Sequence, residues 1–143
     1  MIKGKARKWL AALIFASLAF IWGQSLFSRS ASTEQSLWVL SIFDSIFGEG
    51  VFTDHIVRKL AHFTEYAVLG AELYLFFGRY RLAITHGLFA ALADESLQML
   101  SDRSAEVKDV LIDFGGVIIG AAACLLLAAL IFKIRERKNL SSN

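Results

Sequence analysis

"WLAALIFASLAFIWGQSLF", residues 9–27, decides the fold class, because these 19 residues carry no formal charge. A helix that rises about 1.5 Å per residue crosses roughly 30 Å of hydrocarbon over such a length. Basic residues before the run and small residues after it are also typical of a signal peptide. The run is longer than a usual signal core and has no clear A-x-A cleavage site, so we interpret it as a retained membrane helix.

Further segments downstream have the length of membrane helices, although polar residues interrupt the first two of them. They are residues 58–77, 82–100 and 109–132. The chain of 143 residues is 56% hydrophobic and contains no proline, which is too apolar for an ordinary soluble domain. We therefore predict an all-α fold, a single integral membrane domain over residues 1–143 that forms a four-helix bundle.

The long loop of residues 28–57 separates the first two predicted helices. Within it, "SLWVLSIFDSIF" (residues 36–47) is too short to span a membrane but has apolar residues at helical spacing. Gly48 and Gly50 mark its end. The pattern predicts a short interfacial helix, which could be a lid over the bundle or a simple connector.

The distribution of basic residues predicts how the bundle is oriented. Ten of the 15 lysines and arginines lie before the first helix, between the second and third helices, and after the fourth. The positive-inside rule puts these segments in the cytoplasm and residues 28–57 outside. We predict a multi-pass protein of the plasma membrane with both termini cytoplasmic. Nothing in the sequence supports nucleic-acid binding, and the single Cys124 excludes an intramolecular disulfide.

Polar residues in the last three predicted helices lie at matching depths, within about 10 Å of the outer membrane surface. They are His62 and Glu65, then Asp94, Glu95 and Gln98, and finally Asp109 and Asp113. Residues three, four or seven apart share a helical face, and Gly116 and Gly120 would let the fourth helix approach a neighbour closely. An uncompensated charge costs at least ~2.5 kcal/mol at the membrane centre. These residues therefore predict one inward-facing polar site, or else a structural network in which Arg58, Lys59 and Arg103 neutralise the acids.

The same residues carry a resemblance to a known family. "RKLAHFTEYAVLG" (58–70), "ADESLQML" (93–100), Arg103 and "DVLIDFGGVIIG" (109–120) contain the motifs K-x-x-H-F-x-E-Y, D-E-x-x-Q, R and D-V-x-x-D-x-x-G in order. Over about residues 55–125 the sequence resembles the VanZ-like family of small bacterial membrane proteins, named for a teicoplanin-resistance protein. The resemblance implies a bacterial plasma-membrane protein, and for some members a lowered susceptibility to glycopeptides. It singles out Lys59, His62, Glu65, Tyr66, Asp94, Glu95, Gln98, Arg103, Asp109 and Asp113.

The chemistry of these side chains suggests their roles. A histidine among carboxylates can act as general acid and base, which makes His62, Glu65, Asp94 and Glu95 the candidate catalytic residues. With Asp113 they are also candidate ligands for a divalent metal ion: oxygen ligands suit Mg²⁺, Mn²⁺ or Ca²⁺, and a histidine admits Zn²⁺ or Fe²⁺. Arginine and lysine at the rim favour a phosphate. The candidate ligand-binding residues are Arg58, Lys59, Tyr66, Gln98, Arg103, Asp109 and Asp113.

Three classes of function fit this site. The first is an enzyme acting on a phosphate-bearing lipid or a lipid-linked cell-wall precursor, and the second is a non-catalytic binding or scaffold protein for such a lipid. The third, a small proton-coupled transporter, is the weakest, because only Glu72 and His86 continue the polar residues toward the cytoplasm. No nucleophile, phosphate-loop or H-E-x-x-H motif names a reaction.

Overall fold

The computed structural model describes residues 4–26, 29–100 and 106–141, and every regular element in these ranges is an α-helix. The helices are α1 (Lys5–Ser25), α2 (Arg29–Phe47), α3 (Asp54–Phe77), α4 (Tyr80–Met99) and α5 (Val107–Ser141). The prediction of an all-α fold is confirmed. By length and hydropathy, two of the described helices, α1 and α5, qualify as membrane spans. The four-helix membrane bundle with four crossings therefore stays a prediction.

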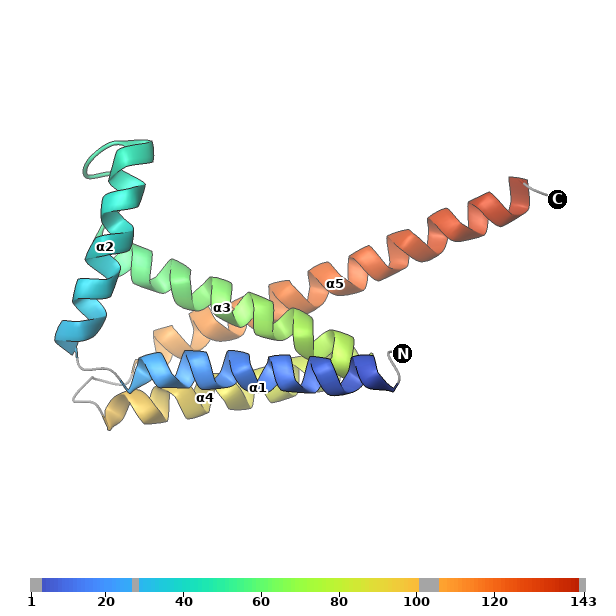
Figure 1. Cartoon of the computed structure of the whole chain (residues 1–143), viewed down its shortest axis with the longest axis horizontal. Coiled ribbons are helices and arrows are strands. Elements are labelled where there is room, and N and C mark those ends of the chain that lie inside the picture. Colours follow the sequence, from blue (N-terminus) through green and yellow to red (C-terminus); the bar gives the residue numbers. More distant parts are fainter. Residues whose placement is uncertain (1–3, 27–28, 101–105, 142–143) are drawn as a thin grey trace.

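Four of the helices alternate in direction. Figure 1 shows α1 and α4 running one way and α3 and α5 running the other, so that the two termini lie at the same end of the bundle. The C-terminal part of α5 diverges from the other helices. The alternation agrees with a chain that has both termini on one side of a membrane.

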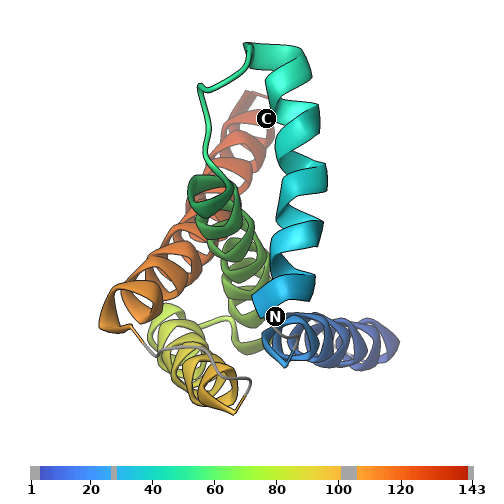
Figure 2. The ribbon, with the colours of Figure 1, turned by 90° about the vertical axis from the view of Figure 1, so that its left-hand side faces the viewer.

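Helix α2 lies crosswise to this bundle, at the end opposite the termini (Figures 1 and 2). It begins at Arg29, seven residues before the predicted interfacial segment, and ends at Phe47. Gly48 and Gly50 follow with φ of 97° and 80°, a left-handed conformation that glycine adopts without strain, so they end the helix as predicted. A helix perpendicular to the bundle axis is compatible with a position in the membrane interface.

A polar contact fastens α2 to the start of α3. Ser36 and Arg58 both donate hydrogen bonds to Asp54, and the distance from Arg58 Nη2 to Asp54 Oδ2 is 2.5 Å. Burial on its own would raise the pKa of Asp54, but the two donors outweigh it and hold the pKa below its usual range. Asp54 is therefore ionised at neutral pH, and the contact weakens only when acid protonates it.

Helices α3 and α5 pack backbone to backbone through glycines. A Cβ atom added at Gly120 would lie 1.7 Å from the carbonyl oxygen of Ala67, and one at Gly116 would lie 2.4 Å from that of Phe63. The predicted close approach of the last helix to a neighbour is thus confirmed, and α3 is that neighbour. Beside this contact, the fully buried side chains of Leu69 and Val117 form the centre of the core.

We predict that Gly120→Ala destabilises the protein by about 1 to 3 kcal/mol, because α3 and α5 would have to separate. Gly115→Ala is the matched control: its new Cβ would have Phe63 as its nearest neighbour at 3.8 Å, an ordinary contact. Loss of glycine freedom should leave this control as stable as the parent or slightly more so. Thermal unfolding of both variants in detergent is the measurement, and equal melting temperatures would contradict the prediction.

The predicted orientation can be tested by cysteine labelling in a Cys124→Ser background. Ser45 on α2 and Glu136 on α5 are both exposed, and α2 lies at the end of the bundle opposite the C-terminus of α5. In intact cells, an impermeant maleimide should modify Ser45→Cys but should modify Glu136→Cys only after permeabilisation. Labelling of position 136 in intact cells would show that the orientation is wrong.

Candidate functional site

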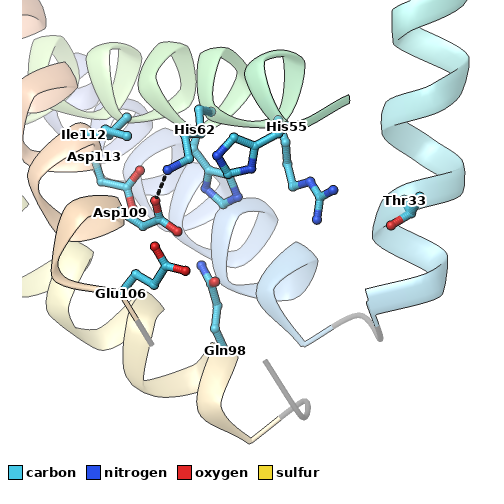
Figure 3. Close-up of a pocket in the computed structure, with 10 residues that line it drawn as sticks. Thr33, His55, His62, Gln98, Glu106, Asp109, Ile112 and Asp113 are labelled. Atoms are coloured by element: carbon cyan, nitrogen blue, oxygen red, sulfur yellow. Dashed lines mark hydrogen bonds and ion pairs between the residues drawn. The ribbon is translucent and has the colours of Figure 1, made fainter. Parts of the chain in front are cut away.

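A polar cavity of about 340 Å³ opens at the end of the bundle next to α2. Its walls come from α2, α3, α4 and the first turns of α5. It is lined by Thr33, His55, Arg58, Lys59, His62, Gln98, Glu106, Asp109, Ile112 and Asp113. Figure 3 shows Thr33 on α2 facing the cavity from the side opposite Asp113. Six of the lining residues are candidates that the sequence analysis selected.

Three side chains from three helices meet at the inner wall of this cavity. The ligand atoms of His62 (α3), Asp94 (α4) and Asp113 (α5) all lie within 4.8 Å of one another. Both aspartates are buried, with 0% and 2% of their surfaces exposed, and His62 is partly exposed toward the cavity. The sequence placed these residues at one depth, and the fold brings them together.

Asp94 lies behind the cavity and accepts hydrogen bonds from two helices. Ser25 Oγ of α1 donates to Asp94 Oδ1 at 2.5 Å, and Gln98 Nε2, one turn further along α4, donates to Oδ2 at 3.1 Å. His62 Nδ1 lies 3.9 Å from Oδ2. These partners compensate the burial of the carboxylate and fix its orientation.

Asp113 has a different environment. Its carboxylate lines the cavity, yet it makes no hydrogen bond or ion pair with any residue in the described part of the chain. Four carboxylates lie close enough to act on it electrostatically, namely Asp94, Asp109, Glu95 and Glu65. A buried acid surrounded by like charges is costly unless something in the cavity compensates it.

Glu65 and Glu95 are held by other partners and do not line the cavity. Gln24 of α1 donates to Glu65 Oε1 at 3.1 Å, and the backbone N–H of Glu106 donates to Glu95 Oε1 at 2.5 Å. The second contact attaches the end of α4 to the start of α5. The structure thus puts these two candidate catalytic acids beside the site rather than on its surface.

The cations at the rim already have partners. Lys59 Nζ lies 2.7 Å from Asp109 Oδ1 (dashed in Figure 3), and Arg58 pairs with Asp54 on its own helix. Arg103, the third predicted cation, lies outside the described residues. The alternative of a structural ion-pair network therefore applies to these two cations, although both still line the cavity.

Of three further polar residues, Tyr66 and Glu72 are buried between helices and His86 lies on the surface. The fully buried Tyr66 donates from its hydroxyl to the carbonyl of Ala90 at 3.3 Å, so it joins α3 to α4. Glu72, deeper in the bundle, accepts a hydrogen bond from Ser17 of α1 at 3.0 Å. His86 is exposed. Neither Glu72 nor His86 lines the polar cavity, so these two residues do not extend it toward the other end of the bundle.

Sequence reasoning missed the contribution of α1. Gln24 and Ser25 donate to site acids, although the uncharged first helix was not expected to take part in the site. Their position in the sequence could have indicated this role, because both lie in the last turn of α1, at the depth where the acids of the other helices gather. A polar pair at the end of an apolar span is also what an ordinary membrane boundary looks like.

The residues of the site lie within a segment that matches a known family. A family model described as VanZ/LLP1 matches residues 9–130, which is most of the chain. The chain belongs to the VanZ/LLP1 family. Family membership, together with the two apolar helices α1 and α5, indicates a membrane protein. No curated protein and no solved structure matched this VanZ/LLP1 chain.

We predict that Ser25→Ala destabilises this VanZ/LLP1 protein by about 1 to 3 kcal/mol, because Asp94 would lose a donor in a buried position. Ser45→Ala is the control, since the Ser45 hydroxyl is exposed and donates only to the carbonyl of Ile42 on its own helix. Thermal unfolding of both variants in detergent measures the difference. A melting temperature for Ser25→Ala equal to that of the control would mean that the Ser25 contact does not hold α1 to α4.

Proposed function

We propose that this VanZ/LLP1 protein binds the phosphate-bearing headgroup of a membrane lipid or of a lipid-linked cell-wall precursor. The observation that carries the proposal is the open polar cavity, which combines cations and acids and has a volume of about 340 Å³. This volume is in the usual range of small-ligand pockets, roughly 300 to 1,000 Å³. In the predicted orientation the cavity opens at the outer surface of the bacterial plasma membrane.

The cations supply the anion-binding part of the proposal. Lys59 and Arg58 line the cavity while each remains paired with an acid. A phosphate would share the Lys59 ammonium with Asp109, since an ammonium has three donors. We assign the bidentate contact to Arg103, which follows the D-E-x-x-Q segment of α4 in the sequence, because the guanidinium fork matches phosphate geometry.

Such a function would explain a link to glycopeptide antibiotics. A protein that holds a lipid-linked wall precursor at the outer surface changes how much of that precursor is accessible there. This fits a family named for a teicoplanin-resistance protein. The proposal requires only binding, so a scaffold or masking role satisfies it without a chemical step.

Catalysis on the bound headgroup is the second candidate function. His62 lies on the cavity wall with its Nδ1 3.9 Å from the carboxylate of Asp94, an arrangement in which the acid can orient the imidazole as a general base. His62→Gln tests this candidate, because an enzyme that uses the imidazole as its base loses turnover, whereas a purely binding protein has no turnover to lose.

The binding proposal predicts that Lys59→Gln reduces the phosphate-bearing lipid retained by the purified protein several-fold. Lys108→Gln is the matched control. Lys108 lies in the first turn of α5, is exposed, and does not line the cavity. Arg103→Lys keeps the charge but loses the fork, so it should also reduce retention. Mass spectrometry of lipids extracted from each variant, with its melting temperature, is the measurement. Unchanged lipid in Lys59→Gln and Arg103→Lys would reject the proposal.

A further inference from the structure

Among the described residues, none donates a hydrogen bond to the carboxylate of Asp113 or forms an ion pair with it, which leaves a place for a cation at the cavity wall. The residue is 2% exposed and lines the cavity, and four other carboxylates act on it electrostatically. Lys59 and Arg58 are directed to Asp109 and Asp54 instead. Burying an acid without such a partner costs free energy, because the group either stays charged in a poorly solvated place or has to take up a proton, and a bound cation removes this cost.

The geometry around Asp113 is that of a metal site. Its carboxylate and the donor atoms of His62 and Asp94 lie within 4.8 Å of one another. Two ligands of a single ion, each bound at about 2.0 to 2.5 Å, can be no more than about 4 to 5 Å apart. Small side-chain rotations would therefore bring all three atoms onto one ion. Each ligand comes from a different helix, so the ion would join α3, α4 and α5.

We propose that His62, Asp94 and Asp113 bind a divalent transition-metal ion at the inner wall of the cavity. One imidazole and two carboxylates suit Mn²⁺, Fe²⁺ or Zn²⁺ better than Mg²⁺ or Ca²⁺, which prefer oxygen ligands alone. The contacts of Ser25 and Gln98 with Asp94 then act as the outer hydrogen bonds that orient a metal ligand. Three protein ligands leave coordination positions open toward the cavity.

The open positions give the ion a role in binding, and this role, though not the binding of the ion itself, rests on the function proposed above. A phosphate oxygen entering a cavity rich in carboxylates is repelled by them. A divalent ion at the inner wall reverses the local charge and offers the phosphate a direct ligand position. The rim cations would then hold the outer oxygens of the same group.

The test uses the full-length protein in detergent, treated with EDTA and titrated with Mn²⁺. Electron paramagnetic resonance measures bound Mn²⁺ and detects the hyperfine coupling of an imidazole nitrogen. The parent should bind one Mn²⁺ with nitrogen coupling. Asp113→Asn should weaken binding by at least about tenfold, and His62→Gln should abolish the nitrogen coupling. His86→Gln and Glu34→Gln are the controls for an exposed histidine and for an exposed acid outside the cavity, and both should bind Mn²⁺ like the parent.

Thermal unfolding shows whether Asp113 acts as a metal ligand or is needed for the stability of the fold. In EDTA, Asp113→Asn should be at least as stable as the parent, because the change removes a buried carboxylate that has no hydrogen-bond or ion-pair partner among the described residues. Mn²⁺ should raise the melting temperature of the parent and leave that of Asp113→Asn unchanged. Absence of Mn²⁺ binding by the parent, or equal affinity in Asp113→Asn, would overturn the metal site.

Lipid retention, measured on the same samples, distinguishes this inference from the proposed function. Loss of retained lipid in EDTA, with recovery on adding Mn²⁺, supports both. Mn²⁺ binding without any dependence of lipid retention on Lys59 keeps the metal site and rejects the lipid function. Lipid retention that depends on Lys59 in a protein that binds no Mn²⁺ rejects the metal site and keeps the lipid function.

Discussion

The backbone contact between α3 and α5 is the constraint on which the site depends. Gly116 and Gly120 lie against the carbonyls of Phe63 and Ala67, and no Cβ fits at either glycine. Phe63 follows His62 in sequence, and Gly116 follows Asp113 by three residues, so the same crossing that seats the glycines also sets the distance between these two polar side chains. A wider separation of α3 and α5 would leave His62 and Asp113 facing each other across a gap. The small residues in the middle of the helices therefore determine the chemistry at their end.

Helix α1 completes the interior by donating hydrogen bonds along its length. Ser17, Trp22, Gln24 and Ser25 donate to Glu72, the carbonyl of Ala90, Glu65 and Asp94, in that order along the helix. All of these acceptors belong to α3 or α4. Inside a membrane water is not available to satisfy such groups, so a neighbouring helix has to do it. The part of α1 after Lys8 has no charge, and in this way it can offset part of the cost of burying acids on neighbouring helices.

The distribution of charge in the cavity favours a ligand that brings or shares a cation. Lys59 and Arg58 are balanced by acids, and Asp113 is not balanced by any residue in the ranges that the structure describes. A phosphate alone would add negative charge to this wall, whereas a phosphate and a divalent ion together would satisfy both the wall and the rim. The proposed lipid function and the proposed metal site are therefore two parts of one electrostatic requirement. Helix α2, lying across the end of the bundle and held through Asp54, forms one wall of the cavity through Thr33.

The sequence by itself determined the all-α class, the approximate bounds of α1, α3 and α4, the start and the glycine face of α5 and the common depth of His62, Asp94 and Asp113. It did not determine the end of α5, which was predicted at residue 132 and lies at Ser141. Helical periodicity and the rise per residue fix these properties within each segment. Only the tertiary structure decided that Glu65 and Glu95 turn to Gln24 and to the backbone of Glu106, that Lys59 pairs with Asp109, and that Ser25 supports Asp94. The rotation of one helix against another is set by packing across their contact, and no single helix carries that information in its own periodicity.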